Sequence, residues 1–457
     1  MTITTALEAL SPVLGDRLSR SKPDLAAHGQ SESYFPLTPP DAVAWPETTA
    51  EVAQILAICA EHGCPVVPWG TGTSLEGHAL ALEGGLSLDL ARMNRLLEVH
   101  PEDMDAVVQP GLTREELNRD LRTTGLFFPV DPGANASLGG MAATRASGTT
   151  TVRYGTMADN VLGLEVVLGD GRVIRTGTRA RKSASGYDLT RLFVGSEGTL
   201  GVITELTLRL HGQPEAIAAA VCAFGEIGAA VDCVIATIQS GIKVARIEFV
   251  DAETAAAVNA YSRGEFPEKP HLLVEFHGSE QGVAEESQRF GELVSEMGGE
   301  GFRWSTRPED RRALWEMRHT AYWAILASRK GARAVVTDLC VPISRLAEAV
   351  EETRADIAAS PIPGPILGHM GDGNFHAILL IHDDAPEELA AAKALSHRMV
   401  ERALRLGGTV TGEHGVGAGK LDYMEEEHGA GWALMGDIKR AVDPKGILNP
   451  GKLVPRG

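Results

Sequence analysis

Two short segments in the C-terminal part of the chain carry side chains whose types suit catalysis at a bound metal ion. GHMGDGNFH contains His369 and His376, and GEHG contains Glu413 and His414. Two imidazoles and one carboxylate suit a catalytic divalent metal that keeps an open coordination position. His414 directly follows Glu413, and a neutral imidazole beside a cation can accept a proton from a coordinated alcohol. The pattern indicates an enzyme that deprotonates an alcohol.

The histidine spacing alone leaves a structural interpretation open. The chain has 14 histidines, and an isolated histidine is most often hydrogen-bonded or at the surface. Gly371 and Gly373 argue against a helix, since each costs a helix about 1 kcal/mol relative to alanine. The segment also lacks the alternation of a half-buried strand, and the H-E-x-x-H signature is absent. Spacing therefore allows either a metal site or a group of structural histidines.

The composition argues against nucleic acid as a main partner. The 457 residues include 42 Lys and Arg against 61 Asp and Glu, which gives a net charge of −19. Binding to a phosphate backbone needs a cationic face, which this balance does not favour. The charge also disfavours general docking to anionic lipid, and an anionic substrate would need specific arginines.

Cysteine usage and hydropathy are typical of a cytoplasmic protein. The five cysteines are scattered without a CxxC pair, so reduced thiols are expected rather than a zinc ribbon or a disulfide framework. No secretory signal is evident, and no apolar run approaches the roughly 20 residues that span a bilayer. We expect a cytoplasmic location, with peripheral contact at the inner membrane left open.

Periodicity and glycine content predict an α+β protein of several parts. The expected parts are an N-terminal helix and connector (1–35), a Gly-rich domain (36–213), a second α+β domain (214–434) and a C-terminal segment (435–457). In the first domain, strands are expected at 65–69, 85–90, 105–110, 163–177 (with a GDG turn) and 201–210, and helices at 49–62 and 113–124. In the second, helices are expected at 225–240, 253–262, 281–297, 309–328 and 387–407, and strands at 243–250, 272–276, 333–341 and 376–382. HGQPEAIAAAV, beginning at residue 211, is expected to be a linker.

A Gly-rich loop after the apolar sequence PVVP could hold a pyrophosphate. Its freed backbone amides and hydroxyl groups would form an anion nest. The nest consists of Gly70, Thr71, Gly72, Thr73 and Ser74. Leu75 occupies the position where the Rossmann fingerprint requires glycine, and GVGAGKL does not match a P-loop. A nicotinamide or nucleoside triphosphate is therefore not supported.

Three more Gly/Ser clusters lie in the same domain: DPGANASLGGMAATRASG, RYGTMADN and SGYDLTRLFVGSEGTLGVIT. Alone, each is a turn between strands. Four together suggest a long dinucleotide laid across many backbone amides, with glycines where the ligand comes too close for a side chain. FAD has that length and does not require the Rossmann pattern, so FAD is the expected cofactor.

These motifs resemble a two-part flavoprotein family. WGTGTSLEGH, DPGANASLGGMAATRASGTTTVRYGTMADNVLGLEVVL and SGYDLTRLFVGSEGTLG resemble the vanillyl-alcohol-oxidase type of FAD domain. GHMGDGNFH, GEHGVGAGK and ILNPGK resemble the FAD-linked oxidase C-terminal domain, and residues 315–346 are most similar to cytochrome-type D-lactate dehydrogenases. The resemblance implies an α+β fold: a two-part FAD-binding PCMH-type domain, and an α+β substrate (cap) domain with an antiparallel sheet flanked by helices. Residues 435–457 would return to the FAD domain.

The resemblance also implies which residues hold the cofactors. The FAD contacts would be Pro68, Gly70, Thr71, Gly72, Thr73, Ser74, Pro132, Gly133, Gly139, Gly140, Ser147, Gly148, Tyr154, Gly155, Gly195, Glu197, Gly198, Gly201, Ile203 and Asn449. The divalent metal, zinc or manganese, would be held by His369, His376 and Glu413. His78 lies beyond the first Gly loop and is not expected to tether FAD, so FAD binding is expected to be non-covalent.

The remaining site residues take roles from the same resemblance. His414 would be the general base, Asn374 a polar contact to substrate and Arg318 the clamp for the substrate carboxylate. Relatives acting on D-2-hydroxyglutarate place a lysine shortly before the aspartate of a TDLCVP-like strand, whereas this chain has Val335 and Val336 there. A monocarboxylate, and D-lactate first, is therefore expected.

The expected reaction is oxidation of a D-2-hydroxy acid to the 2-oxo acid. The alternatives are a glycolate or broader D-2-hydroxy-acid dehydrogenase, a flavin-dependent transferase of the ether-lipid-synthase type and a non-catalytic flavin subunit. A quinone, cytochrome c or an electron-transfer flavoprotein would each serve as electron acceptor. The sequence leaves open whether the protein forms a homodimer.

Overall fold

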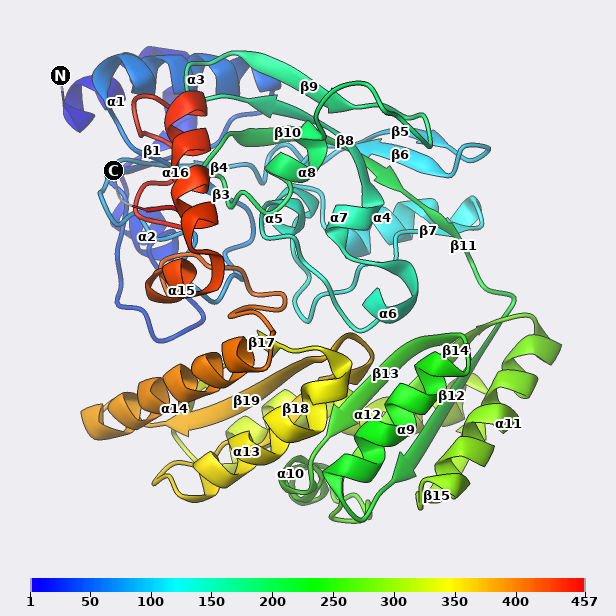
Figure 1. Ribbon diagram of the computed structural model, residues 1–457. Coiled ribbons are helices and arrows are strands. Elements are labelled where there is room, and N and C mark those ends of the chain that lie inside the picture. The colour runs from blue at the N-terminus through cyan, green and yellow to red at the C-terminus, as the bar shows by residue number, and fades with distance from the viewer. Residues whose placement is uncertain (1, 456–457) are drawn as a thin grey trace. The chain divides into compact units, whose positions relative to one another are not determined.

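The computed structural model describes residues 2–455, which form two compact units. The first unit comprises the chain up to Gly148, Gly155–Gln213 and the segment from Glu413 onward, and the second comprises Thr149–Tyr154 and Pro214–Gly412. The segment that rejoins the first unit therefore begins at Glu413, earlier than residue 435. No helix within residues 2–455 is both long and apolar enough to cross a membrane. Figure 1 shows the elements of each unit.

The first unit contains a four-stranded sheet in the order β1-β2-β4-β3. Its strands are β1 (Leu18–Ser19), β2 (Ala42–Ala44), β4 (Leu86–Asp89) and β3 (Val66–Trp69). Helices α1 (Ile3–Leu14) and α3 (Thr49–His62) share a hydrophobic core with this sheet. The Thr48 hydroxyl caps α3 by accepting from the Glu51 amide, and Gly63 ends it at a φ of 66°.

The first unit also contains a five-stranded antiparallel sheet in the order β5-β6-β10-β8-β9. Its strands are β5 (Leu96–His100), β6 (Asp105–Val108), β10 (Val202–Arg209), β8 (Val161–Val167) and β9 (Val173–Gly177). The GDG turn joins β8 to β9 as the sequence predicts, with Gly171 at a φ of 84°.

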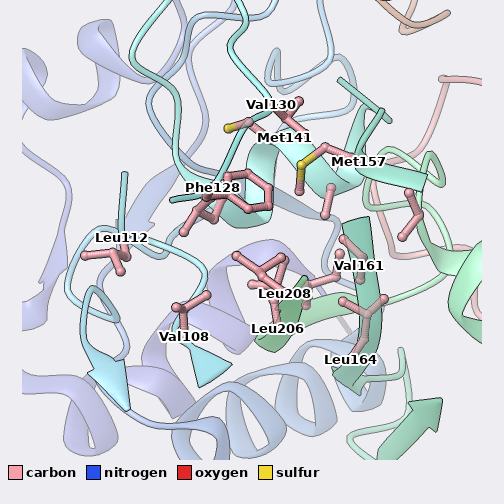
Figure 2. Packing of buried hydrophobic residues seen from close by; sticks show 14 of the residues in the cluster. Val108, Leu112, Phe128, Val130, Met141, Met157, Val161, Leu164, Leu206 and Leu208 are labelled. Atoms are coloured by element: carbon pink, nitrogen blue, oxygen red, sulfur yellow. The ribbon is translucent and has the colours of Figure 1, made fainter. Parts of the chain in front are cut away.

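The core of this part lies between the five-stranded sheet and a layer of short helices and loops. Figure 2 shows Leu206 and Leu208 of β10 close to Phe128, with Met141 of α5 on its other side. The other elements of the unit are α2 (Lys22–Ala27), α4 (Arg114–Asp120), β7 (Leu126–Phe127), α5 (Leu138–Ala143), α7 (Met157–Asn160), α8 (Leu189–Phe193), β11 (His211–Gly212), α15 (Met424–His428) and α16 (Ala430–Val442).

The second unit is built on an eight-stranded antiparallel sheet. The order is β15-β12-β14-β13-β18-β19-β16, and β17 also pairs with β19. The strands are β12 (Ala216–Ala223), β13 (Val244–Val250), β14 (His271–Gly278), β15 (Glu300–Ser305), β16 (Arg333–Val336), β17 (Leu339–Cys340), β18 (Ile366–His369) and β19 (Asn374–Ile381).

Helices cover both faces of this sheet. Helices α10 (Ala252–Ser262) and α12 (Pro308–Ser328) enclose one apolar core with it. Helices α9 (Ile227–Gln239), α11 (Glu280–Glu296) and α13 (Leu346–Ala358) lie over the opposite face in Figure 1. The unit is completed by α6 (Thr151–Tyr154) and α14 (Pro386–Arg405). This α+β arrangement of antiparallel sheet and flanking helices is the one predicted.

Several elements of the second unit depart from the sequence expectation. The expected linker at AIAAAV is part of strand β12, which pairs with β14 and β15 on its two sides. Alanine favours helices, but pairing on both edges overrides that local preference. Helix α13, strand β18, which carries His369, and the edge strand β15 were not predicted.

Candidate functional site

The two histidines of the second unit predicted to bind metal share one face of its sheet with Glu248, which was not predicted. Glu248 and Val250 are two residues apart on β13, and Val250 pairs with Leu367 of β18. Leu367 pairs directly with His376 of β19 and precedes His369 by two positions. Side chains two apart, or directly opposite on antiparallel strands, point to the same face. Register therefore brings both histidines and a glutamate to the face that α12 covers.

Glu248 connects His369 to Arg318. Its Oε1 lies 2.7 Å from His369 Nδ1, and its Oε2 accepts from Arg318 Nε at 2.8 Å. The Glu248 side chain is completely buried. Burial alone would raise the pKa of this carboxyl, but its interactions with His369 and Arg318 hold the pKa below its usual range. Glu248 is thus a buried carboxylate with a basic partner on each oxygen.

Arg318, on α12, has the geometry of a carboxylate clamp. Its Nε is committed to Glu248, and within residues 2–455 its two terminal nitrogens make no hydrogen bond. The side chain is 19% exposed. A guanidinium held through Nε presents its terminal N–H groups as a rigid fork for a carboxylate.

Hydrogen bonds fix the tautomers of both site histidines. His376 Nδ1 lies 2.9 Å from the Thr337 carbonyl oxygen, which can only accept, so this nitrogen carries the proton. His369 Nδ1 donates to the Glu248 carboxylate in the same way. Each ring therefore has its lone pair on Nε2, which is the form that ligates a metal, and the ring centroids are 5.6 Å apart. The donor chemistry of the two rings fits a divalent cation.

Asn374 lies directly opposite His369 and is held firmly by its amide nitrogen. Nδ2 donates to Asp338 Oδ1 and to the Leu339 carbonyl, both at 2.8 Å. Its Oδ1 is buried and has no hydrogen-bond partner among the described residues. A buried acceptor without a donor is costly, so this atom suits a donor supplied by a bound ligand.

The chain just before Glu413 is fixed beside these residues. Thr411 Oγ1 donates to Asp338 Oδ2 at 2.7 Å. A Cβ added at Gly412 would lie 2.1 Å from Asn374 Nδ2, so a larger residue would displace the Asn374 amide. Residues 411–412 therefore belong to the same polar cluster as Asn374 and Asp338.

Glu413 and His414 begin the last segment of the first unit. Glu413 Oε2 accepts from the Ser147 hydroxyl at 2.8 Å. Ser147, which the sequence assigned to FAD binding, therefore holds a predicted metal ligand.

The turn that follows His414 is held by Glu197, another predicted FAD contact. The two Glu197 oxygens accept from the amides of Val416 and Gly417 at 2.7 and 2.8 Å. His78 Nε2 lies 3.3 Å from the same carboxylate. A Cβ at Gly415 would come within 2.7 Å of both Glu197 and His78. Burial alone would raise the Glu197 pKa, but His78 and the two amides hold it below its usual value.

The first Gly-rich loop has the features of an anion nest. Residues 70–74 follow β3, and none of their five backbone amides donates a hydrogen bond within residues 2–455. The Thr71 and Thr73 hydroxyls lie 3.2 Å apart. Adjacent amides without acceptors fit an anionic group such as a pyrophosphate.

Most of the other predicted FAD glycines are required by the protein itself. A Cβ at Gly139 would lie 2.5 Å from Pro110, one at Gly148 2.3 Å from the Asp131 carbonyl oxygen and one at Gly201 2.4 Å from Val166. Similar conflicts with protein atoms occur at Gly70, Gly72, Gly155, Gly195 and Gly198, and Gly140 lies tight against Ser137. Gly133 differs from these, because the space that its Cβ would occupy is open. Close contact with a ligand is therefore not needed to explain most of these glycines.

Two other predicted FAD residues make unexpected contacts. Asn449 Nδ2 donates to the carbonyl oxygens of His78 and Glu197, and its Oδ1 accepts from Lys452. Tyr154 belongs to the second unit, where its hydroxyl lies 2.7 Å from His277 Nδ1. Pro68 is the third residue of β3, Ile203 lies on β10, and Pro132 is in the loop before α5.

Sequence reasoning missed Glu248 and Asp338. Each of these acids lies in a run of strand-forming apolar residues, as in ARIEFV and VVTDLC. An acidic residue in such a run is an available signal, because it is buried only when paired.

Two family profiles together cover most of the chain. Residues 40–177 match the FAD binding domain, and residues 213–453 match the C-terminal domain of FAD linked oxidases. The chain belongs to the FAD-linked oxidase family and is an FAD-dependent oxidoreductase.

Curated relatives match over most of their length. The chain is 47% identical to a probable mitochondrial D-lactate dehydrogenase of Danio rerio, covering 93% of this chain and 87% of the relative. It is 45% identical to a mitochondrial D-lactate dehydrogenase [cytochrome] of Arabidopsis thaliana, covering 98% and 80%. It is also 37% identical to the glycolate oxidase subunit GlcD of Bacillus subtilis, covering 91% and 89%.

Solved structures of lower identity share the fold. A p-cresol methylhydroxylase has a TM-score of 0.81 at 19% identity, covering 98% of this chain and 96% of that one. An alkyldihydroxyacetonephosphate synthase has a TM-score of 0.76 at 20% identity, covering 98% and 84%. At these identities the likeness establishes the fold and not the reaction.

Proposed function

We propose that this flavoprotein oxidises a D-2-hydroxy acid, and D-lactate in particular, to the 2-oxo acid. The relatives named D-lactate dehydrogenase support the substrate, since they match at 47% and 45% identity over nearly the whole chain. The observation that carries the proposal is the arrangement of Arg318 and His369 on the two oxygens of Glu248. A carboxylate clamp beside a metal-binding imidazole suits an acid whose hydroxyl is on the neighbouring carbon.

Arg318 would bind the substrate carboxylate. Its terminal nitrogens offer two parallel N–H donors, and Glu248 keeps the guanidinium plane fixed. Val335 and Val336 supply no cation at their two positions, so a second carboxylate on the substrate would lose its partner. The site therefore favours monocarboxylates.

His369, His376 and Glu413 would hold a divalent metal, zinc or manganese. The imidazoles have the required tautomers. Glu413 follows Gly412 in the chain, and Gly412 packs against Asn374. Because consecutive Cα atoms are about 3.8 Å apart, the Cα of Glu413 lies at that distance from the Cα of Gly412. A bound cation would lower the pKa of the substrate hydroxyl and so favour its deprotonation.

His414 would take the hydroxyl proton, and Asn374 would orient the substrate. The buried Oδ1 of Asn374 can accept a hydrogen bond from the substrate hydroxyl before the proton leaves. Ser147 binds the side chain of Glu413, which precedes the base, and Glu197 binds the amide of Val416, two residues after it, so the segment around the base is held on both sides. FAD, bound non-covalently, supplies the hydride acceptor.

A cytochrome-type protein is the proposed electron acceptor. The Arabidopsis relative is named for a cytochrome, and so is a relative from Saccharomyces cerevisiae that is 40% identical. A quinone and an electron-transfer flavoprotein are the other acceptors to test, each in turn in an assay of D-lactate oxidation.

Glycolate is the second candidate substrate, because one relative is a glycolate oxidase subunit. The test is a substrate panel at fixed acceptor: D-lactate, L-lactate, glycolate and D-2-hydroxyglutarate. The proposal predicts the highest kcat/KM for D-lactate. A higher value for glycolate would move the assignment to that substrate, and a higher value for D-2-hydroxyglutarate would contradict the monocarboxylate preference.

A further inference from the structure

The Glu248 carboxylate has a basic side chain on each of its two oxygens. One oxygen faces the imidazole of His369 at 2.7 Å, and the other accepts from the guanidinium of Arg318 at 2.8 Å. The side chain has no exposed surface, and it comes from the middle of a central strand. Its two partners come from the neighbouring strand β18 and from helix α12, so Glu248 links a side chain of the sheet to one of the helix.

Each contact has a different consequence. The contact to His369 Nδ1 fixes the ring orientation and leaves the lone pair on Nε2, and a carboxylate partner also raises the basicity of that nitrogen. The contact to Arg318 Nε sets the plane in which its terminal nitrogens lie. A shift of the Glu248 side chain that satisfies one partner better must alter its contact with the other.

We propose that Glu248 is a positioning residue that couples metal binding at His369 to carboxylate binding at Arg318. This inference rests on the proposed function. Glu248 touches neither the metal nor the substrate; it acts through the two residues that do. Occupancy of either site holds Glu248 in the geometry that the other site needs, so each ligand binds more tightly when the other is present. Such coupling is reciprocal by thermodynamic necessity.

The coupling also restricts the substrate. Because one carboxylate holds both partners, Arg318 and the His369 imidazole are kept at neighbouring positions on the same sheet face. An acid with the hydroxyl on the adjacent carbon can reach both, whereas a 3-hydroxy acid has one carbon too many. We therefore expect 3-hydroxybutyrate to bind without the mutual tightening that pyruvate and D-lactate give.

The diagnostic variant is Glu248→Gln. It keeps the size of the side chain, but its amide has only one oxygen to accept from two donors, so one of the two contacts is lost. Glu248→Asp keeps the charge but is shorter by one methylene and cannot reach both partners. The matched control is Glu275→Gln, because Glu275 is also a buried carboxylate beside a histidine, on the neighbouring strand β14.

The experiment measures the dissociation constant of Zn²⁺ or Mn²⁺ for metal-stripped, FAD-loaded protein, by competition with a fluorescent chelator, with and without saturating pyruvate. Wild type should bind metal more tightly when pyruvate is present. Glu248→Gln should weaken metal binding about 10- to 100-fold and abolish the effect of pyruvate. Glu275→Gln should change neither quantity by more than about two-fold, which is the expected size of an unrelated effect.

Two results would overturn the inference. One is a Glu248→Gln protein with the metal affinity and the pyruvate effect of wild type. The other is an equal loss in Glu275→Gln, which would indicate a general effect of removing a buried carboxylate. If Glu248→Gln does not fold, judged by FAD content, Glu248→Asp tests the same coupling: because it cannot reach both partners, it should weaken metal binding or lose the pyruvate effect, and wild-type values of both would overturn the inference.

Failure of this inference differs from failure of the proposed function. If the wild-type protein binds metal and D-lactate reduces its flavin, the proposed function is supported, whatever the result for Glu248→Gln. A wild-type protein that binds neither metal nor pyruvate contradicts the function itself, and with it the coupling.

Discussion

The carboxylate of Glu197 accepts a hydrogen bond from the backbone amide of Val416 at 2.7 Å, joining motifs that are 219 residues apart in the sequence. Its second oxygen accepts from the next amide, that of Gly417. Glu197, in the Ser-Glu-Gly sequence at 196–198, therefore fixes the turn that follows the proposed base His414. A residue assigned to the cofactor from its motif has a structural role that connects distant segments of the first unit.

Replacing Glu197 by alanine should destabilise the protein and slow the reaction. Two buried amides would lose their acceptor, and each unsatisfied buried group costs about 1–3 kcal/mol. Urea denaturation measures the stability, and kcat measures the position of the base. Glu205→Ala is a suitable control, since its partner Arg175 is largely exposed. Wild-type stability in Glu197→Ala would show that these hydrogen bonds contribute little.

Replacing His414 by glutamine should slow flavin reduction without releasing FAD. General-base catalysis typically contributes about 10²- to 10⁴-fold, and glutamine cannot accept the substrate proton. Anaerobic stopped-flow measurement at saturating D-lactate reports this step directly. A wild-type rate constant in the variant would remove His414 from the mechanism.

Replacing Arg318 by lysine should raise KM more than it lowers kcat. Lysine keeps the charge but not the two parallel donors, and it cannot reproduce the Nε contact with Glu248. Steady-state kinetics with D-lactate separates the two constants. If KM is unchanged, the carboxylate of the substrate is bound elsewhere.

Replacing Glu51 by glutamine should remove a contribution to the free energy of unfolding that wild type loses at acidic pH. The hydrogen bonds from Arg17 lower the pKa of Glu51 to about 2 in the folded protein, against about 4.3 for an unperturbed glutamate. The stabilisation is fully present above the unfolded pKa and is lost as pH falls toward the folded pKa. Across that acidic range the free energy of unfolding of the variant should therefore fall less steeply than that of wild type. Equal slopes in urea titrations would contradict this.

The sequence identified the family and predicted a strand from His376 onward, which is β19, but it did not predict β18, which carries His369. GHMGDGNFH as a whole shows no strand alternation, because β19 is buried on both faces. Its glycines form the tight turn between β18 and β19, with Gly373 at a φ of 77°. Periodicity therefore did not show that the two histidines lie on paired strands.

The supporting residues could not be assigned from the sequence because their partners are distant. Glu248 is 70 residues from Arg318 and 121 from His369, and no local pattern links them. What the sequence does contain is an acidic residue within an apolar strand, which implies a buried partner without naming it.

The most direct test of D-lactate oxidation is the anaerobic visible spectrum of the purified, metal-replete protein before and after addition of D-lactate, with L-lactate as the control. D-lactate should bleach the flavin band, and L-lactate should leave it unchanged. A flavin band that neither isomer bleaches, in a protein that contains its metal, would contradict D-lactate oxidation.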